Sequence, residues 1–174
     1  MSKRSKRWSV VLSVGVLLAA LAATGSFPAA AEEAGKEVPL ILVADTVLGV
    51  VGIPEAEIPK KVCVLSSRFN PGQQIVWRVR VYDPTTGQPL DDTTLDLVEV
   101  ALPGDQVLKA RYGPHPPPPQ EPTDFFWSTS WVVPQDYPSG SLPFIITAKA
   151  KDGRSGEFIE FNVAPSLLII VPAG

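Results

Sequence analysis

The chain has 174 residues, with 15 Lys+Arg, 18 Asp+Glu, 13 Gly and 19 Pro, but a single Cys, His and Met. One Cys and one His cannot form, within the chain, a disulfide, a CxxC redox pair or a metal site built from several Cys and His ligands, and the initiator as sole Met excludes a Cys/His/Met copper centre. The high Gly and Pro content disfavours a helical bundle.

The first 31 residues have the three parts of a secretory signal in order. Four basic residues lie between positions 3 and 7, an apolar run covers residues 8–23, and three alanines at 29–31 offer a cleavage site. The apolar run is shorter than the roughly 20 residues of a membrane-spanning helix. We therefore expect an exported protein, periplasmic, extracellular or on the cell surface, that stays at the membrane only if the signal is uncleaved.

The full chain has a net charge of −3, and removal of this segment makes it more acidic. It leaves 11 Lys+Arg against 18 Asp+Glu, a net charge of about −7. A surface of that sign repels phosphate backbones, and no Lys/Arg cluster offsets it. The charge argues against nucleic acid as a partner, and no motif indicates a cofactor.

The region that follows the signal divides into a leader, residues 32–61, and a domain, residues 62–174. Within the leader, residues 40–51 are nearly continuously apolar and rich in β-branched side chains, which predicts an extra N-terminal strand. Residues 62–69 are the next predicted strand. Cys63 lies there between apolar neighbours, so we expect a buried small hydrophobe; the alternatives are an intermolecular disulfide or a reactive thiol.

The clearest strand covers residues 75–82, where apolar and other side chains alternate. Trp77 belongs to the inward set. A turn at 83–87 ends this strand, and residues 93–102 and 106–112 then form a hairpin around Pro103-Gly104-Asp105. The apolar set of the first arm changes face near Leu97, which indicates a β-bulge.

Residues 114–122, PHPPPPQEP, contain six prolines and favour an extended, rigid surface loop. We expect this loop to join the two halves of the domain and to carry the chain from one sheet to the other. The alternative is a docking segment for an aromatic groove on a partner. Its candidate contact residues are Pro116, Pro117 and Pro118.

Four more strands are predicted, at residues 124–133, 142–150, 158–163 and 167–171, with an Asp-Gly turn at 151–156. In the first of them Trp127 and Trp131 share one face. We expect that face to lie in the core, and the alternative is a platform for sugar rings or a protein partner. The aromatic residues expected nearest the surface are Phe126 and Tyr137.

Two stretches resemble bacterial immunoglobulin-like modules. Residues 71–90, PGQQIVWRVRVYDPTTGQPL, resemble their opening strand and turn, and residues 144–163, with Asp152-Gly153 at the centre, resemble their closing hairpin. The likeness covers roughly residues 62–171. The spacing of the strands and turns by itself predicts an all-β sandwich or barrel of about 7–9 strands. The resemblance implies that it is an immunoglobulin-like Greek-key β-sandwich, and it implies no reaction. The cysteine pair that joins the two sheets in this family is missing, because Cys63 is the only cysteine and has no second cysteine to pair with.

Reactive groups are sparse. No GxSxG, HExxH or GxxxxGK[ST] pattern occurs, and His115, the only His, lies in the proline run, where we expect an exposed loop side chain. We therefore expect no enzymatic activity. Calcium is the more reasonable ligand because hard cations take carboxylate oxygens from loops, although turn formation explains the same residues equally well. The weak candidates are Asp83, Asp91, Asp92 and Asp152.

The sequence as a whole predicts an exported, non-catalytic, immunoglobulin-like domain that acts as a structural or protein-binding accessory module of the cell envelope. Its expected partner is another envelope protein, contacted through a strand edge or the proline loop. The alternative is a carbohydrate-binding module that holds a polysaccharide with surface aromatic side chains.

Overall fold

The computed structural model describes residues 38–160 and 167–172. The predicted signal segment therefore lies outside the described residues, as does the end of the strand predicted for residues 158–163. Almost every regular element of the described part is a β-strand, and the only helical elements there are two short ones, η1 and α1, between β1 and β2. The elements are β1 (Ile41–Leu48), η1 (Glu55–Glu57), α1 (Ile58–Lys61), β2 (Arg68–Phe69), β3 (Gln74–Tyr82), β4 (Leu95–Leu102), β5 (Gln106–Lys109), β6 (Arg111–His115), β7 (Asp124–Val132), β8 (Gly140–Ser141), β9 (Ile145–Ala150), β10 (Ser155–Ile159) and β11 (Ile169–Ile170).

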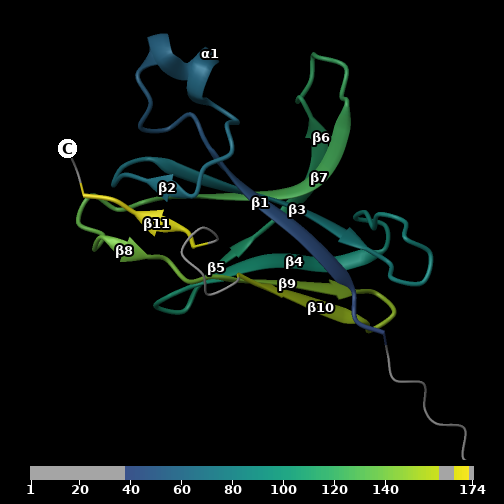
Figure 1. Ribbon diagram of the computed structural model, residues 1–174. Helices are drawn as coiled ribbons and strands as arrows, with labels where there is room; N and C mark the ends of the chain where they lie inside the picture. The colour runs from purple at the N-terminus through teal and green to yellow at the C-terminus, as the bar shows by residue number, and fades with distance from the viewer. Residues whose placement is uncertain (1–37, 161–166, 173–174) are drawn as a thin grey trace, which may run out of the picture. The chain divides into compact units, whose positions relative to one another are not determined.

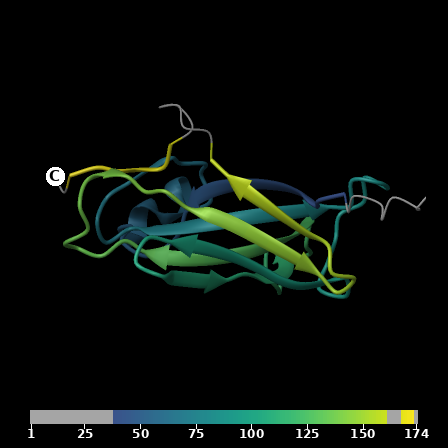
Figure 2. The same cartoon turned by 90° about the horizontal axis from the view of Figure 1, so that it is seen from below.

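The strands form two four-stranded antiparallel sheets, as expected for a β-sandwich (Figure 1). One has the order β1-β3-β7-β6 and the other the order β10-β9-β4-β5. Seen from below, β9 and β10 lie in front of β1 and β3 (Figure 2). A small third sheet, β2-β11-β8, contains a parallel pair between β2 and β11. The all-β prediction is confirmed.

One core lies between the two large sheets. The predicted alternation of β3 is confirmed, because every second residue of the strand is buried. Trp77 is fully buried and contacts Phe144 edge-on, with the ring centroids 5.8 Å apart. The core includes Leu40, Phe69, Ile75, Trp77, Val79, Val81, Leu95, Val98, Val100, Trp127, Val133, Leu142, Ile146, Ala148, Leu168 and Ile170.

The hairpin predicted around Pro103-Gly104-Asp105 is confirmed as β4 and β5. The register between β4 and β9 shifts between Leu95 and Leu97, so the predicted irregularity exists next to Leu97. The extra residue lets both Leu95 and Val98 point into the core, although their spacing is odd.

The strand predicted in the leader is β1, which pairs with β3 along its whole length. Leu42, Ala44 and Leu48 of this strand pack against the core, and Leu40, just before it, is buried there. On the outer face, Arg78 Nε and Nη2 donate to the two carboxylate oxygens of Asp45 at 2.7 and 2.9 Å. This bidentate pair joins β1 to β3 on the side that faces away from the core.

The proline-rich run is not a crossover between sheets, contrary to the sequence prediction. β6 and β7 are neighbours in one sheet, with Pro114 opposite Phe125 and His115 opposite Asp124. The run is therefore the loop of a hairpin. Pro114 is tolerated because β6 is an edge strand, where a missing N–H breaks no ladder. The chain changes sheets at Ala110 instead, directly between β5 and β6.

The strand predicted for residues 62–69 is also wrong over most of its length. Only β2 at its end and an isolated bridge between Leu65 and Val47 have strand pairing. Cys63 lies in a turn with φ of +62° and is exposed, not buried. Its N–H donates to the carbonyl of Leu48, so this segment is held against the end of β1. Its apolar neighbours suggested a strand, but they follow a helical turn.

Candidate functional site

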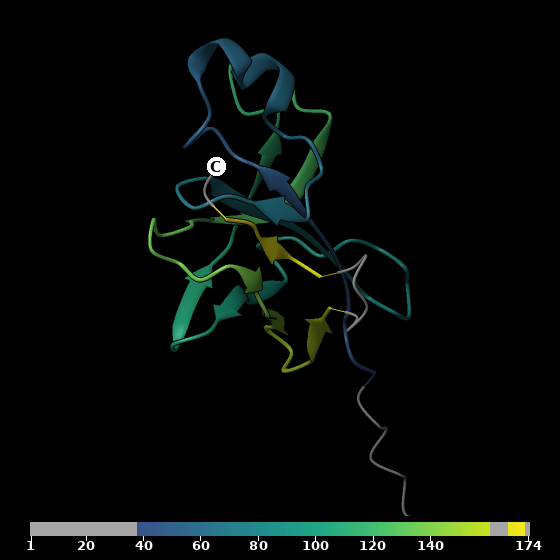
Figure 3. The same ribbon diagram turned by 60° about the vertical axis from the view of Figure 1, so that its left-hand side comes forward.

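The β6–β7 hairpin carries the predicted partner-contact residues. Pro117 and Pro118 are exposed and Pro116 is half-buried, and the rest of the loop through Thr123 is exposed. In Figure 3 the hairpin and the α1 segment lie on the same side of the domain. Proline supplies no backbone N–H, so this loop offers a partner carbonyl oxygens and flat apolar rings on a stiff chain.

The base of this loop is fixed by polar contacts. The Thr123 N–H and hydroxyl both donate to the carbonyl of His115, at 2.9 and 3.3 Å. Arg80 on β3 forms an ion pair with Asp124, the first residue of β7. These contacts close the loop at its two ends, so the exposed prolines project from a rigid base.

Phe126 is not a surface aromatic residue, contrary to the sequence prediction. Its side chain points to the outer face of the sheet, as the alternation requires, yet it is buried. The guanidinium carbons of Arg78 and Arg80 lie 5.7 and 5.9 Å from its ring centroid, and the His115 ring packs against it at a tilt of 38°, with the centroids 5.3 Å apart. His115 is therefore a half-buried packing residue and not the exposed loop side chain that we expected.

A groove of about 230 Å³ lies beside this cluster, and residues of β1, β3, β6, β7 and the turn at Cys63 line it. Cys63, Arg78, His115 and Phe126 all contribute to its wall. Hydrogen bonds to the Asp45 carboxylate raise the pKa of Arg78, so the guanidinium in this wall stays protonated and paired with that carboxylate. The groove extends from His115, at the base of the proline loop, to the exposed thiol of Cys63. The sequence did not predict that these two residues lie at one groove.

The aromatic row of β7 faces the core, as expected. Trp127 is buried, and its Nε1–H donates to the carbonyl of Leu90 at 3.2 Å. Trp131 is half-buried and meets Tyr137 edge-on, with the centroids 5.2 Å apart. Trp127 and Trp131 therefore do not form an exposed flat platform, and Tyr137 packs against the end of their row.

The calcium candidates lie in turns. Asp83 and Asp152 come together because Arg154 Nη1 and Nε donate to them, each at 2.8 Å. Asp91 accepts hydrogen bonds from the N–H and hydroxyl of Thr93, and Asp92 lies next to it. The guanidinium already supplies the positive charge between the first two carboxylates. Within residues 38–160 and 167–172, no group of three or more His, Cys, Asp or Glu side chains is placed to hold a metal ion.

Loss of Arg154 is expected to change how stability depends on acid. Hydrogen bonds from Arg154 lower the pKa of Asp83, and the Arg154 N–H and guanidinium lower that of Asp152. A carboxyl group with a depressed folded pKa stabilises the fold above its unfolded pKa and stops doing so as pH falls through the folded value. The stabilisation should thus be present at neutral pH and lost below about pH 4. Urea midpoints measured from pH 7 to pH 2 should fall less steeply below pH 4 in Arg154→Leu than in the wild type.

Arg111→Leu is the matched control, since it removes an equal charge from the exposed edge strand β6. In this variant the fall of the urea midpoint below pH 4 should be as steep as in the wild type. If the urea midpoint of Arg154→Leu also falls as steeply below pH 4 as that of the wild type, the ion pairs of Arg154 with Asp83 and Asp152 do not contribute to acid sensitivity.

The outer face of the second sheet carries an apolar row that was not predicted from the sequence. Ile159 pairs with Ile145, Ile145 with Ala101, and Ala101 with Val107, so the row crosses all four strands. Ile159 is 62% exposed, Val107 50% and Ile145 41%. The alternation along each strand could have placed these residues outward, but only the register shows that they form one line.

No solved structure, curated protein sequence or protein family was found to match this chain. In the part of the chain that the structure describes, no helix is long and apolar enough to cross a membrane.

Proposed function

We propose that the chain is an exported, non-catalytic immunoglobulin-like module of the cell envelope that binds another envelope protein through the exposed loop of its β6–β7 hairpin. The observation that carries this proposal is the loop itself, whose prolines are exposed while its two ends are fixed by hydrogen bonds and an ion pair. A protein with a groove lined by aromatic side chains is the partner that such a segment fits best.

The order of the strands supports the immunoglobulin-like assignment. Immunoglobulin constant-type domains place their first, second, fifth and fourth strands in one sheet and their third, sixth and seventh in the other. With β1, β3, β4, β6, β7, β9 and β10 counted as these seven strands, the observed sheets have the same order. β5 is then an added strand beside β4.

The energetics of a proline loop favour binding. Extended proline segments have few conformations to lose, so little entropy opposes their ordering on a partner. The Arg80–Asp124 ion pair and the Thr123–His115 hydrogen bonds limit that loss further, because they hold the ends of the loop before a partner arrives. The carbohydrate alternative lacks such an observation, since Trp127 is buried and Trp131 packs on Tyr137.

Replacement of residues 117–122 with Gly and Ser residues tests the proposal. The wild-type chain, cross-linked in intact cells and purified from the envelope, should recover a defined protein partner. The loop variant should recover at least about tenfold less of it, because the apolar rings and the preformed extension are both lost. His115 and Thr123 stay in place, so the hairpin keeps its base.

A matched variant replaces the exposed turn residues Thr85 and Thr86 with Gly and Ser. It should recover the partner as the wild type does. Equal recovery from the proline-loop variant and the wild type would contradict the proposed contact. A labelled polysaccharide retained by the wild type, and lost only when Trp131 or Tyr137 is replaced, would favour the carbohydrate alternative.

A further inference from the structure

β5 is a free edge of the second sheet. It lies last in the order β10-β9-β4-β5, and Gln106, Val107 and Lys109 on it are exposed. Among the described residues, no backbone hydrogen bond joins β5 to an element other than β4. An edge strand of this kind presents a row of unpaired N–H and C=O groups, and another strand can pair with them.

The pairing with β4 shows which backbone groups of β5 point outward. The Ala110 N–H donates to the Val98 carbonyl at 2.8 Å, and continuation of the β4–β5 register places these two residues opposite each other. In an antiparallel ladder, hydrogen-bonded pairs alternate with pairs that are not hydrogen-bonded. Leu108 is therefore bonded to β4, whereas Val107 and Lys109 direct their N–H and C=O groups toward the free edge.

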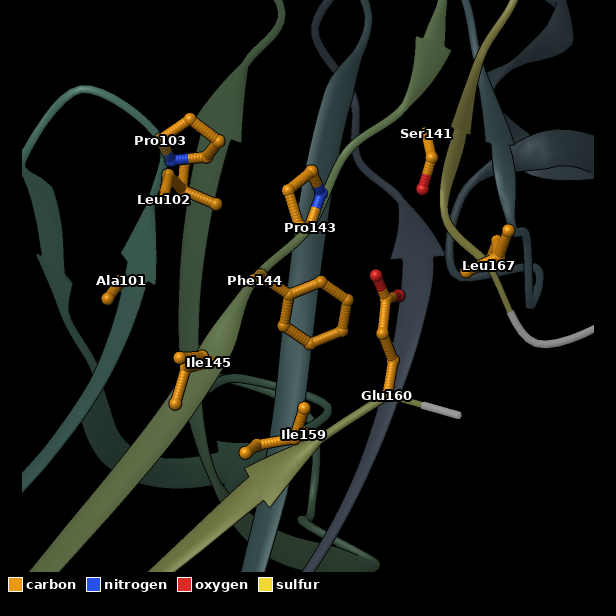
Figure 4. Close-up of a pocket in the computed structure, with 10 residues that line it drawn as sticks. All are labelled: Ala101, Leu102, Pro103, Ser141, Pro143, Phe144, Ile145, Ile159, Glu160 and Leu167. Atoms are coloured by element: carbon orange, nitrogen blue, oxygen red, sulfur yellow. The ribbon is translucent and has the colours of Figure 1, made fainter. Parts of the chain in front are cut away.

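Val107 also ends the apolar row on the outer face of this sheet. Figure 4 shows Ile159, Ile145 and Ala101 following one another across β10, β9 and β4, along one side of a cavity of about 490 Å³. Val107 lies opposite Ala101 and is 50% exposed. The row thus reaches the free edge, and the next strand to pair there extends it, because opposed residues of paired strands share a face.

A second copy of β5 fits this edge better in one register than in the others. An antiparallel pair of identical strands has a two-fold axis, so the residue on the axis defines the register. With Val107 on the axis, each Lys109 lies opposite Asp105 of the other copy, and opposite charges meet twice. An axis at Lys109 brings two ammonium groups together. An axis at Gln106 or Leu108 places each Lys109 opposite an apolar side chain.

The two charged side chains are available for this contact. Lys109 and Asp105 are both exposed, and Asp105 lies in the turn that precedes β5. Glu99 lies opposite Lys109 within the chain. Even so, neither Lys109 nor Asp105 forms an ion pair in the part of the chain that the structure describes. Opposite charges that face each other across two paired strands stabilise the pair, and like charges destabilise it.

We propose that the chain forms a two-fold symmetric dimer in which β5 pairs antiparallel with β5 of a second copy, with Val107 on the axis and each Lys109 opposite Asp105 of the other copy. The two Val107 residues then exchange both of their backbone hydrogen bonds. The two four-stranded sheets join into one of eight strands, and the apolar row continues across both copies. Because β5 has only four residues, the contact is small and the dimer dissociates on dilution. It does not involve the β6–β7 loop.

Sedimentation equilibrium tests the charge pairing, in a Cys63→Ser background that prevents disulfides between exposed thiols. The purified chain should show a reversible monomer–dimer equilibrium between about 10 µM and 1 mM. Lys109→Asp and Asp105→Lys should each weaken dimerisation at least about tenfold, because like charges then meet twice. An equimolar mixture of these two variants should regain the dimer, since opposite charges meet again. Lys149→Asp, which makes the same charge change on exposed β9, should leave the equilibrium unchanged.

Disulfide cross-linking in the same background tests the position of the axis. Val107→Cys should give a covalent dimer on oxidation, because the Cα atoms of a hydrogen-bonded pair lie about 5.5 Å apart, within the span of a disulfide. Ile159→Cys should give little, although Ile159 is more exposed, because it lies at the other end of the row. A chain that stays monomeric at about 1 mM would overturn the proposal. Failure of the mixed charge variants to regain the dimer, or equal cross-linking at the two positions, would overturn it too.

Discussion

Ile146→Ala should lower the free energy of unfolding by about 2–5 kcal/mol, whereas Ile145→Ala, one position earlier on β9, should cost less than about 1 kcal/mol. The reason is the alternation of the strand. Ile146 is fully buried between the two sheets, so truncation removes its contacts and leaves a cavity. Ile145 points outward and is 41% exposed, so its truncation removes little buried area.

The two variants control for each other, because residue type, strand and substitution are the same and only the face differs. Urea unfolding at neutral pH gives both free energies from one experiment. Similar losses at the two positions would contradict the register between β9 and β4, in which Ile146 lies opposite Val100 and Ile145 opposite Ala101. A larger loss of unfolding free energy for Ile145→Ala than for Ile146→Ala would mean that Ile145, and not Ile146, faces the core.

Strands with one buried face were predictable from the sequence. β3 alternates with a period of two, and burial of every second side chain requires that pattern whatever the neighbouring strands are. The turn at Pro103-Gly104-Asp105 was predictable for a similar reason, since the chemistry of a turn is local. The register shift near Leu97 could be predicted because the apolar positions of a strand change face only where the strand carries an extra residue.

The path of the chain was harder to predict. Composition shows that residues 114–122 are stiff, but it does not show which strands flank them or whether those strands pair. Cys63 was placed in a strand because its neighbours are apolar. Its turn depends instead on a hydrogen bond to Leu48, which lies in another element. Pairing between segments distant in sequence decided both positions.

The candidate sites depend most on distant contacts. Phe126 was placed correctly on the outer face, but its burial comes from Arg78, Arg80 and His115, whose positions above the ring follow from the β3–β7 and β6–β7 registers. Strand alternation predicts the face to which Phe126 points. Its burial depends on the pairing of β3 and β6 with β7, which places the covering side chains over the ring.

The contact between β1 and β10 leads to the second large expected effect. These strands are the edges of the two different sheets, and they meet where the Leu40 N–H donates to the carbonyl of Ser155 at 3.0 Å. Gly156 lies at this meeting point and is buried. A Cβ on Gly156 would come within 2.4 Å of the Leu40 carbonyl oxygen and 2.8 Å of Leu42 Cδ1. Backbone oxygen cannot turn aside as a flexible side chain can, so the strands must separate.

Gly156→Ala is therefore expected to lower the free energy of unfolding by about 1–3 kcal/mol, the usual cost of overpacking. Gly113→Ala on β6 is the matched control, because a Cβ there meets no atom within 4 Å. That substitution should be neutral or stabilising by up to about 1 kcal/mol, since alanine restricts the unfolded chain. Urea unfolding measures both, and hydrogen exchange at the Leu40 amide should accelerate only in Gly156→Ala. Equal stability of the two variants would mean that β1 and β10 do not approach closely, and that the two sheets are held together by their shared core without this contact at the edge.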